Sequence, residues 1–415
     1  MNASTPNARA YLAWGAGALF FCYGFFHRVS PSVMVGDLMR DFDVGAAALG
    51  NLSAFYFYIY AAIQIPVGLL LDRFGPRRLL SFSSLVCALG SLLFGYAGTL
   101  GLAYVGRTLI GLGAAFTWVG VLTIVTLYFP PGRFARFVGL AQMLGMVGAV
   151  AGQAPLAAAV AAFGWRATLV VAAGFGAVLA LGLWTAIGEG EPKIRNADGA
   201  ASGLLAGLRR VMRNPQTWYC ALYGGALTAP TLSFFSLWGV PWLVQVHGLD
   251  RTEAGSLMSL GFVGFGIAAP LVGWYSDWLG RRRIVMIFAA IAALATLLGA
   301  IYWPDLPVVW RTVLIFCHGM STGGMVLGFA AARERNPPEA SGAAYGLVNT
   351  FTVGSGAVFQ PLIGWVLDLG WTGETVSGVR IYSADAFAIA LATLLVGSTI
   401  GVAAALAVRE ERSGR

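Results

Sequence analysis

The most informative shortage in this sequence is of charge. Only 11% of the 415 residues are charged, whereas an ordinary soluble domain has roughly 25%. A soluble protein of this length could not cover its surface with so few charged side chains. Runs of about 20 apolar residues recur instead, and each is long enough to cross a hydrocarbon core roughly 30 Å thick. The composition therefore predicts a polytopic membrane protein.

Groups that bind metals or act in catalysis are scarce as well. There are three histidines, and Cys22, Cys87, Cys220 and Cys317 lie in apolar runs without metal-ligand spacing. We therefore expect no cofactor and no metal, and a membrane enzyme is disfavoured. A sensor would usually have an added soluble domain, but the longest polar stretch is only residues 188–215.

Apolar stretches divide the chain into two sets of six predicted transmembrane helices. They lie near residues 11–35, 47–71, 79–97, 101–128, 137–162, 166–187, 216–246, 255–278, 284–303, 308–332, 341–366 and 384–408. We expect an all-α membrane protein whose two six-helix bundles, residues 1–187 and 216–415, are joined by a cytoplasmic linker at 188–215.

Positive charge is unevenly distributed between the predicted loops. All 26 basic residues are arginine except Lys193, and the loops on one side hold only Arg40, Arg166, Arg251 and Arg380. The positive-inside rule makes the other, arginine-rich side cytoplasmic. Both termini are thus predicted to be cytoplasmic, in a multi-pass protein of the cell inner membrane. The net charge of +8 reflects this topology, and no binding to nucleic acid is expected.

The two halves repeat one another in sequence. At offsets of 204 to 207 residues, Gly68–Gly75 recurs as Gly273–Gly280, Arg107 as Arg311, and Gln153 as Gln360. A duplication of six helices is how many transporters are built, with the substrate site near the bilayer midplane between the repeats. For Gln153 and Gln360, equivalent polar residues in helices 5 and 11, we expect interhelical hydrogen bonds.

Two segments resemble signatures of the major facilitator superfamily. Gly68–Arg78 resembles the loop G-x-x-x-D-R-x-G-R-R, interrupted by Pro76, and Arg107-x-x-x-Gly111-x-Gly113 resembles a second signature. The resemblance covers essentially the whole chain and implies the major facilitator fold of two pseudo-symmetric bundles. It also implies that a cytoplasmic latch, in which aspartate caps a helix N-terminus, is formed by Asp72, Arg73, Arg77, Asp277 and Arg281. The alternative is that these arginines only set the topology.

The first two predicted helices look like those of organic anion transporters. Phe26-His-Arg28 with Ser30-Pro-Ser, followed by the run from Gly50 to Gly68, is similar to anion:cation symporters and sugar-phosphate permeases, which place an arginine in helix 1. The symporters have an acidic residue where this chain has His27, which puts proton coupling through carboxylates in doubt. The second arginine that the permeases carry in helix 7 is absent.

Ionisable residues within the predicted helices are arginines and histidines, because no carboxylate is expected at mid-membrane. A charge there costs about 2.5 to 3.5 kcal/mol, so a substrate anion is the expected partner of Arg28; outward snorkelling or hydrogen bonds to carbonyls are the alternatives. Arg107 is predicted to support helix 1 or the substrate, and Arg311 to snorkel. His27 and His318 are the candidates for carrying a coupled proton, unless they are ordinary hydrogen-bonded histidines.

The remaining candidates for a substrate cavity are polar or aromatic residues: Tyr56, Tyr60, Gln142, His318 and Asn349. Tyr56 and Tyr60 are four residues apart and share one helix face, although such an aromatic stripe usually serves packing. The glycines Gly145, Gly148 and Gly152 in helix 5 are spaced for helix packing and do not match the Gly-Pro signature of drug–proton antiporters.

The sequence thus predicts a secondary active transporter that moves a small organic anion, such as a carboxylate, sugar acid or organophosphate, by alternating access. Uptake is favoured, by symport with H+ or Na+ as candidate coupling ions, and a monomer is expected. The alternative is proton-coupled efflux of amphipathic drugs or other small molecules. Efflux of that kind predicts transport that does not depend on Arg28.

Overall fold

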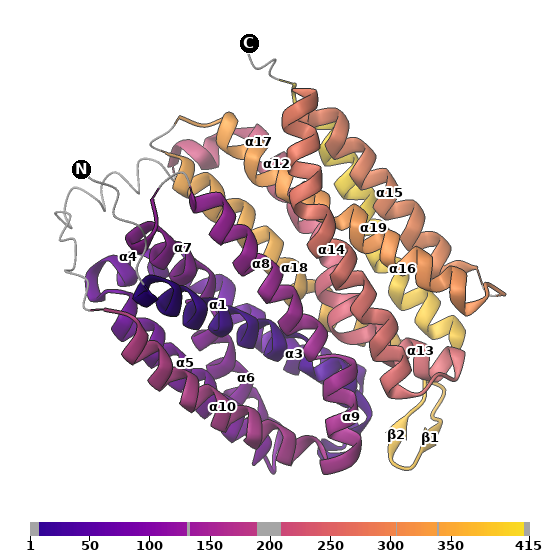
Figure 1. The fold of residues 1–415 in the computed structure, drawn as a ribbon. Coiled ribbons are helices and arrows are strands. Elements are labelled where there is room, and N and C mark those ends of the chain that lie inside the picture. The colour runs from indigo at the N-terminus through magenta and orange to yellow at the C-terminus, as the bar shows by residue number, and fades with distance from the viewer. Residues whose placement is uncertain (1–7, 131–132, 189–208, 304, 338–339, 411–415) are drawn as a thin grey trace. The chain divides into compact units, whose positions relative to one another are not determined.

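The computed structural model describes residues 8–130, 133–188, 209–303, 305–337 and 340–410, and nearly all of them are helical (Figure 1). Within these ranges, eleven helical segments are long and apolar enough to cross a membrane. Helix α1 (Ala8–Val29) has 22 residues and is long enough too, but its glycines, Tyr, Trp and His27 lower its mean hydropathy. Together these segments correspond to the twelve predicted ones, and the predicted all-α membrane fold is confirmed.

One compact unit comprises Met1–Met34 and Phe55–Ile194. It contains α1, the 3-10 helix η1 (Ser30–Met34), the C-terminal part of α3 (Ala46–Ala62), α4 (Gln64–Phe74), α5 (Pro76–Gly95), α6 (Leu100–Ala114), α7 (Thr117–Tyr128), α8 (Phe134–Ala151), α9 (Ala154–Phe163) and α10 (Trp165–Ala186). Several predicted helices are therefore broken in two. The break between α8 and α9 precedes Pro155, which cannot donate to the carbonyl one turn earlier.

Glycines allow α8 to pack closely on α1. A Cβ on Gly148 would collide with the backbone carbonyl of Cys22, and one on Gly145 would lie 2.7 Å from the Phe21 ring. A Cβ on Gly152, one turn further along, would lie 2.8 Å from the Phe26 carbonyl oxygen. The interpretation of these glycines as packing residues is confirmed.

The second compact unit comprises Val35–Ala54 and Arg195–Arg415. Its elements are α2 (Val35–Phe42), the N-terminal part of α3, α12 (Pro215–Pro230), the π-helix η3 (Thr231–Trp238), α13 (Gly239–His247), α14 (Arg251–Leu279), α15 (Arg282–Tyr302), α16 (Val308–Thr322), the 3-10 helix η4 (Gly323–Met325), α17 (Val326–Glu334), α18 (Ser341–Leu369), β1 (Thr375–Val376), β2 (Val379–Arg380) and α19 (Ala384–Ala407). The strands form an antiparallel hairpin between α18 and α19 (Figure 1).

The division of the chain differs in one respect from the predicted bundles. Residues 35–54, which the sequence places in the first bundle, belong to the second unit. Most of the predicted linker, 188–215, lies outside the described residues. The boundaries 1–187 and 216–415 therefore stay a prediction.

Candidate functional site

The end of α1 is shaped by Pro31. Proline has no N–H, so the carbonyl of His27, four residues earlier, loses its usual helical partner and α1 ends at Val29. The freed carbonyl accepts hydrogen bonds from Nη1 of Arg107 at 2.7 Å and from Oγ of Ser30 at 3.1 Å. Pro31 thus creates the acceptor that joins α6 to the end of α1.

The guanidinium of Arg28 lies in the last turn of α1, among aromatic rings. The residue is only 8% exposed, and none of the described carboxylates forms an ion pair with it. Its Cζ lies 4.3 Å from the ring centroid of Phe25, 5.3 Å from Tyr60, 5.6 Å from Tyr56 and 6.0 Å from Phe57. Aromatic rings stabilise a cation by about 0.5 to 2 kcal/mol each but have no net charge. No described acidic side chain therefore neutralises the positive charge of Arg28.

Tyr56 brings the second predicted arginine to the same place. Arg107 is fully buried, and its Cζ lies 5.3 Å from the Tyr56 ring centroid. Tyr56 stacks on Tyr60 at 5.9 Å, and its hydroxyl donates to the Gly24 carbonyl at 3.3 Å. The first unit therefore gathers Arg28, Arg107, Tyr56 and Tyr60, four of the predicted substrate residues, into one buried cluster.

His27 and Gln142 are the other candidates in the first unit. His27 is fully buried, its ring lies 4.5 Å from that of Tyr23 and 5.2 Å from that of Phe26, and neither ring nitrogen has a hydrogen-bond partner among the described residues. Gln142 is partly buried on α8. The ring of His27 thus faces aromatic surface, although its backbone carbonyl anchors Arg107.

His318 and Asn349 lie in the second unit. The Nδ1 atom of His318 is 2.9 Å from the carbonyl oxygen of Ala293 and 3.2 Å from Oγ1 of Thr296. Because a carbonyl only accepts, we assign the proton to Nδ1, which leaves Nε2 buried with no partner in the described part of the chain. Asn349 is partly buried on α18.

The two glutamines related by the repeat both make interhelical hydrogen bonds, as predicted. Oγ of Ser32 donates to Oε1 of Gln153 at 3.2 Å. Nε2 of Gln360 donates at 2.6 Å to the carbonyl of Leu232 in the π-helix η3, and Nε1 of Trp238 donates at 3.0 Å to the Gln360 carbonyl. These contacts hold α18 against η3, a widened helical turn of the kind often found at functional sites.

Arg311 does not snorkel, and that prediction is wrong. The residue is 3% exposed, and its guanidinium donates to the carbonyl of Ala300 at 2.8 Å and to those of Trp303 and Leu306 at 3.3 Å. These carbonyls lie at and beyond the C-terminal end of α15, where the helix dipole favours a cation. The neighbouring helix end thus provides acceptors inside the protein.

The first copy of the predicted latch is described only in part. The side chain of Asp72 lies outside the described residues. Arg73 is exposed, with its Cζ 5.3 Å from the Phe74 ring centroid. Nε of Arg77 donates to the carbonyl of Trp184 at 2.9 Å, and its Cζ lies 4.4 Å from the Trp184 ring, so Arg77 joins the start of α5 to the end of α10.

In the second copy of the predicted latch, the arginine that pairs with Asp277 is Arg282 and not Arg281. Asp277 pairs with Arg282 at 2.7 Å, and Nε of Arg282 also donates to Oε1 of Glu334 at 2.7 Å. The exposed Arg281 forms no ion pair with a described carboxylate. Sequence reasoning missed Arg282 and Glu334. Arg282 stood in the same basic run, but only the fold brings Glu334, at the end of α17, to the start of α15.

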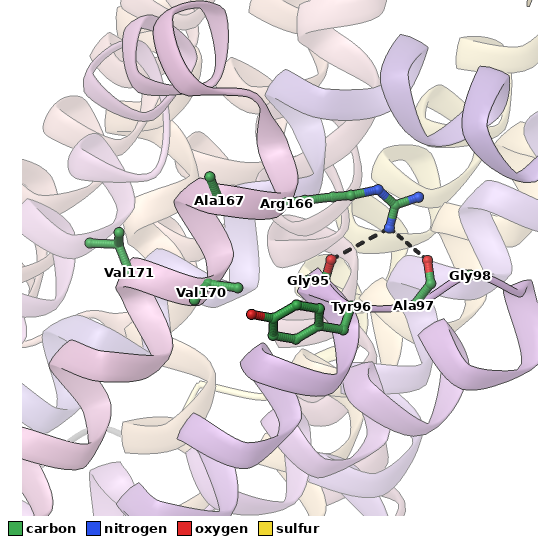
Figure 2. Close-up of a pocket in the computed structure, with 8 residues that line it drawn as sticks. All are labelled: Gly95, Tyr96, Ala97, Gly98, Arg166, Ala167, Val170 and Val171. Carbon is green, nitrogen blue, oxygen red and sulfur yellow. Dashed lines mark hydrogen bonds between the residues drawn. The ribbon is translucent and has the colours of Figure 1, made fainter.

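A groove of about 650 Å³ lies where α5 ends and α10 begins, apart from the cluster around Arg28 (Figure 2). It is lined by Gly95, Tyr96, Ala97, Gly98, Arg166, Ala167, Val170 and Val171. Nη1 of Arg166 donates to the carbonyls of Gly95 at 3.4 Å and Ala97 at 2.6 Å. Arg166 thus ties α10 to the loop after α5, and the groove contains none of the predicted site residues.

Comparisons with known proteins agree on the kind of molecule. A family model described as the Major Facilitator Superfamily matches residues 16–361. The probable nitrate/nitrite transporter NarK2 of Mycobacterium tuberculosis is 29% identical over 340 residues, covering 78% of this chain and 80% of the relative. The probable galactarate/D-glucarate transporter GudP of Bacillus subtilis is 26% identical over 408 residues, covering 89% and 88%.

A solved structure shares the fold. The crystal structure of a bacterial homolog of the human lysosomal transporter Spinster, described as inward-facing and unoccupied, superposes with a TM-score of 0.77. The match covers 97% of this chain and 98% of that one at 16% sequence identity. At this level of identity the likeness concerns the fold alone.

Proposed function

The chain belongs to the Major Facilitator Superfamily, and we propose that it is a secondary active transporter of a small organic anion that works by alternating access. The family and the matched relatives are membrane transporters, so the chain is a transporter and not an enzyme. The anionic substrate, the direction and the coupling are parts of the proposal.

Arg28 is the observation on which the anionic substrate rests. Its guanidinium is buried in a membrane-spanning segment, surrounded by rings that attract a cation without cancelling its charge, and no described carboxylate pairs with it. A buried charge is retained in a membrane protein where it has a partner or a function. An anion entering from water would supply the missing negative charge, and a guanidinium binds carboxylates in a bidentate manner.

A hydroxylated carboxylate fits the residues around Arg28 better than a bare inorganic anion. The rings of Tyr56 and Tyr60 stack beside the guanidinium, and their hydroxyl oxygens offer acceptors to substrate hydroxyl groups. Arg107 adds a second positive charge near Tyr56. The name of the GudP relative specifies sugar diacids and that of NarK2 specifies nitrate and nitrite; both are anions, and we favour a sugar acid.

We further propose uptake across the cytoplasmic membrane with both termini in the cytoplasm. Symport with H+ or Na+ would drive it. The buried His27 and Nε2 of His318, which has no partner among the described residues, are the groups that a coupled proton would use, because the sequence predicts no carboxylate at mid-membrane. The transporter is proposed to act as a monomer.

The first experiment measures thermal unfolding of the purified protein with carboxylates, sugar acids, phosphate esters, nitrate, neutral sugars and cationic dyes. A ligand at a hundredfold excess over its Kd stabilises the folded state by about 2.7 kcal/mol. Sugar acids should raise the midpoint of the wild type and not that of Arg28→Ala. The matched control is Arg311→Gln, another buried arginine, which should lower the midpoint without ligand but keep the shift on adding ligand.

The panel separates the alternatives. Stabilisation by nitrate alone would assign an inorganic anion to the same guanidinium. If dyes or neutral sugars stabilise wild type and Arg28→Ala equally, while anions do nothing, the anion proposal is overturned and drug efflux or sugar transport replaces it.

A further inference from the structure

The start of α3 is capped by a carboxylate from the distant end of α18. Oδ1 of Asp368 accepts the backbone N–H of Ala46 at 3.0 Å, and Oδ2 accepts that of Ala47 at 2.9 Å. One side chain thus satisfies two of the four N–H groups that lack a partner within the helix, at a terminus where the helix dipole also favours negative charge. The partners are more than 320 residues apart in sequence, and both belong to the second compact unit.

Neighbouring groups hold this carboxylate in place. The hydroxyl of Tyr382 donates to Oδ1 of Asp368 at 2.6 Å and accepts the N–H of Ala46 at 3.0 Å, while Nη1 of Arg380 lies 3.4 Å from Oδ1. Burial and the adjacent carboxylate raise the pKa of the Tyr382 hydroxyl, so it remains a donor at neutral pH. Gln245 in turn accepts the backbone N–H of Tyr382 at 2.9 Å.

Close backbone contact between α3 and α18 depends on glycines. A Cβ on Gly364 would collide with the carbonyl oxygen of Ala46, and one on Gly50 would lie 2.5 Å from the carbonyl oxygen of Gln360. A Cβ on Gly45 would lie 2.6 Å from both carboxylate oxygens of Asp368. The two helices therefore fit together over more than one turn, and backbone atoms cannot move aside as a flexible side chain can.

A second link joins the same chain segment to the rest of the unit. Oδ2 of Asp37 in α2 accepts a hydrogen bond from Nη1 of Arg251, at the start of α14, at 2.6 Å. Two contacts thus hold residues 35–54 to the rest of the second unit: the ion pair at α2 and the Asp368 cap at α3. The predicted topology places these contacts on the side away from the cytoplasm.

We propose that Asp368 is a latch that holds the N-terminal end of α3 against α18 in one state of the transport cycle and releases it in the other. The proposal rests on the alternating access of the proposed function. Helix α3 runs without a break from Ala46 to Ala62 and includes Tyr56 and Tyr60, so release at its N-terminus is communicated along one rigid helix to the rings beside Arg28. The latch would thereby couple access on the outer side to the anion site.

The latch is tested with a cysteine reporter at Ala54, which is fully buried and lies one turn after Gly50 on the same face of α3. In a background with the four native cysteines changed to alanine, the labelling rate of Ala54→Cys by a membrane-impermeant maleimide is measured in intact cells. Asp368→Asn keeps the size of the side chain but loses its charge and one acceptor. It should raise the labelling rate about tenfold, equivalent to about 1.4 kcal/mol.

The matched control is Asp250→Asn. Asp250 also caps a helix, accepting the N–H groups of Thr252 at 2.7 Å and Glu253 at 3.0 Å, but it caps the start of its own helix α14. Its loss should leave the labelling rate within twofold of the parent. Equal rates in Asp368→Asn and Asp250→Asn, with both proteins folded by thermal unfolding, would overturn the latch.

A pair of glycine variants tests the same idea without touching a charge. Gly364→Ala should push α3 from α18 and raise labelling, whereas Gly354→Ala, on the same helix with open space around it, should not. Equal labelling in the two would contradict the latch even if Asp368→Asn failed to fold. The labelling rate reports conformation and does not depend on a ligand. Failure of every anion to bind would therefore overturn the proposed function, whereas the latch would still be decided by the labelling rates.

Discussion

Pro31 positions the side chain of Arg107, because proline has no backbone N–H. Its missing N–H leaves the His27 carbonyl free, and Arg107, 80 residues away in sequence, donates to that oxygen. Hydrogen bonds to charged groups contribute about 1.5 to 3 kcal/mol, so this one bond is enough to fix the guanidinium. A residue that reads as a helix breaker is thereby part of the candidate anion site.

We predict that Pro31→Ala weakens anion binding. An alanine N–H can bond to the His27 carbonyl and compete with Arg107, so the guanidinium should lose its fixed position and Kd should rise about three- to tenfold, which corresponds to roughly 0.7 to 1.4 kcal/mol. Titration of the anion identified by thermal shift measures this. Ser30→Ala, which removes only the neutral donor to the same carbonyl, is the control, and equal Kd values for the two variants would contradict the prediction.

Arg107 and Arg311 show that equivalent residues of a repeat can have different partners. Arg107 donates to the end of α1 within the candidate site, whereas Arg311 donates to carbonyls at the end of α15. Their sequence surroundings are similar, and both are buried. Each guanidinium donates to the helix end that lies within hydrogen-bonding distance, which is that of α1 for Arg107 and that of α15 for Arg311.

At the scale of helices, glycine spacing determines how closely α8 approaches α1. The three glycines are three and four residues apart, so they share one helix face, and each lies against a different residue of α1. Without a strong hydrophobic drive between helices in lipid, close van der Waals packing of this kind is a main source of association. The end of α1 that bears Arg28 therefore has a firm support.

We predict that Gly148→Ala destabilises the protein by about 1 to 3 kcal/mol, the usual cost of overpacking. The new methyl group would meet the backbone of Cys22, which cannot rotate away. Gly139→Ala is the control, because the same helix has open space there. Denaturant-induced unfolding in detergent measures the stability of both variants. Equal midpoints for Gly148→Ala and Gly139→Ala would show that α8 can shift without a loss in the free energy of unfolding.

At the scale of the whole molecule, the distribution of arginine predicts which side faces the cytoplasm. Three arginines, Arg281, Arg282 and Arg283, lie where α14 gives way to the first turn of α15, whereas the loop between α18 and α19 has only Arg380. Positive charge near short loops resists translocation. The Asp277–Arg282 pair and the Asp368 cap are thus expected on opposite faces of the membrane.

We predict that Glu374→Cys is labelled by an impermeant maleimide in intact cells and that Arg281→Cys is labelled only after permeabilisation. Both positions are exposed, so a difference in rate reports the side of the membrane and not burial. The cysteine-free parent provides the background. Labelling of Arg281→Cys in intact cells would invert the predicted topology.

Much of the architecture could be predicted because it depends on local sequence. Crossing a bilayer requires about 20 apolar residues in succession, and close helix contacts require small residues at a fixed period, so the membrane-spanning segments and the packing glycines of α8 are visible in the chain itself. The hydrogen-bonding glutamines followed from the repeat. Arg28 was found because a charge within an apolar run is rare.

Which partner each charged side chain takes was decided only by the tertiary structure. Asp368 reads in the sequence as one more acidic residue of an outer loop, and its partners are the N–H groups of Ala46 and Ala47. Arg282 and Arg281 are adjacent and chemically identical, but only Arg282 reaches Asp277 and Glu334. The apolar composition of a segment and the spacing of its small residues determine where a membrane-spanning helix can lie, because each depends only on neighbouring residues of the chain and on the lipid around them. Directed contacts depend on distances of about 3 Å between segments hundreds of residues apart, and these exist only once the helices have packed.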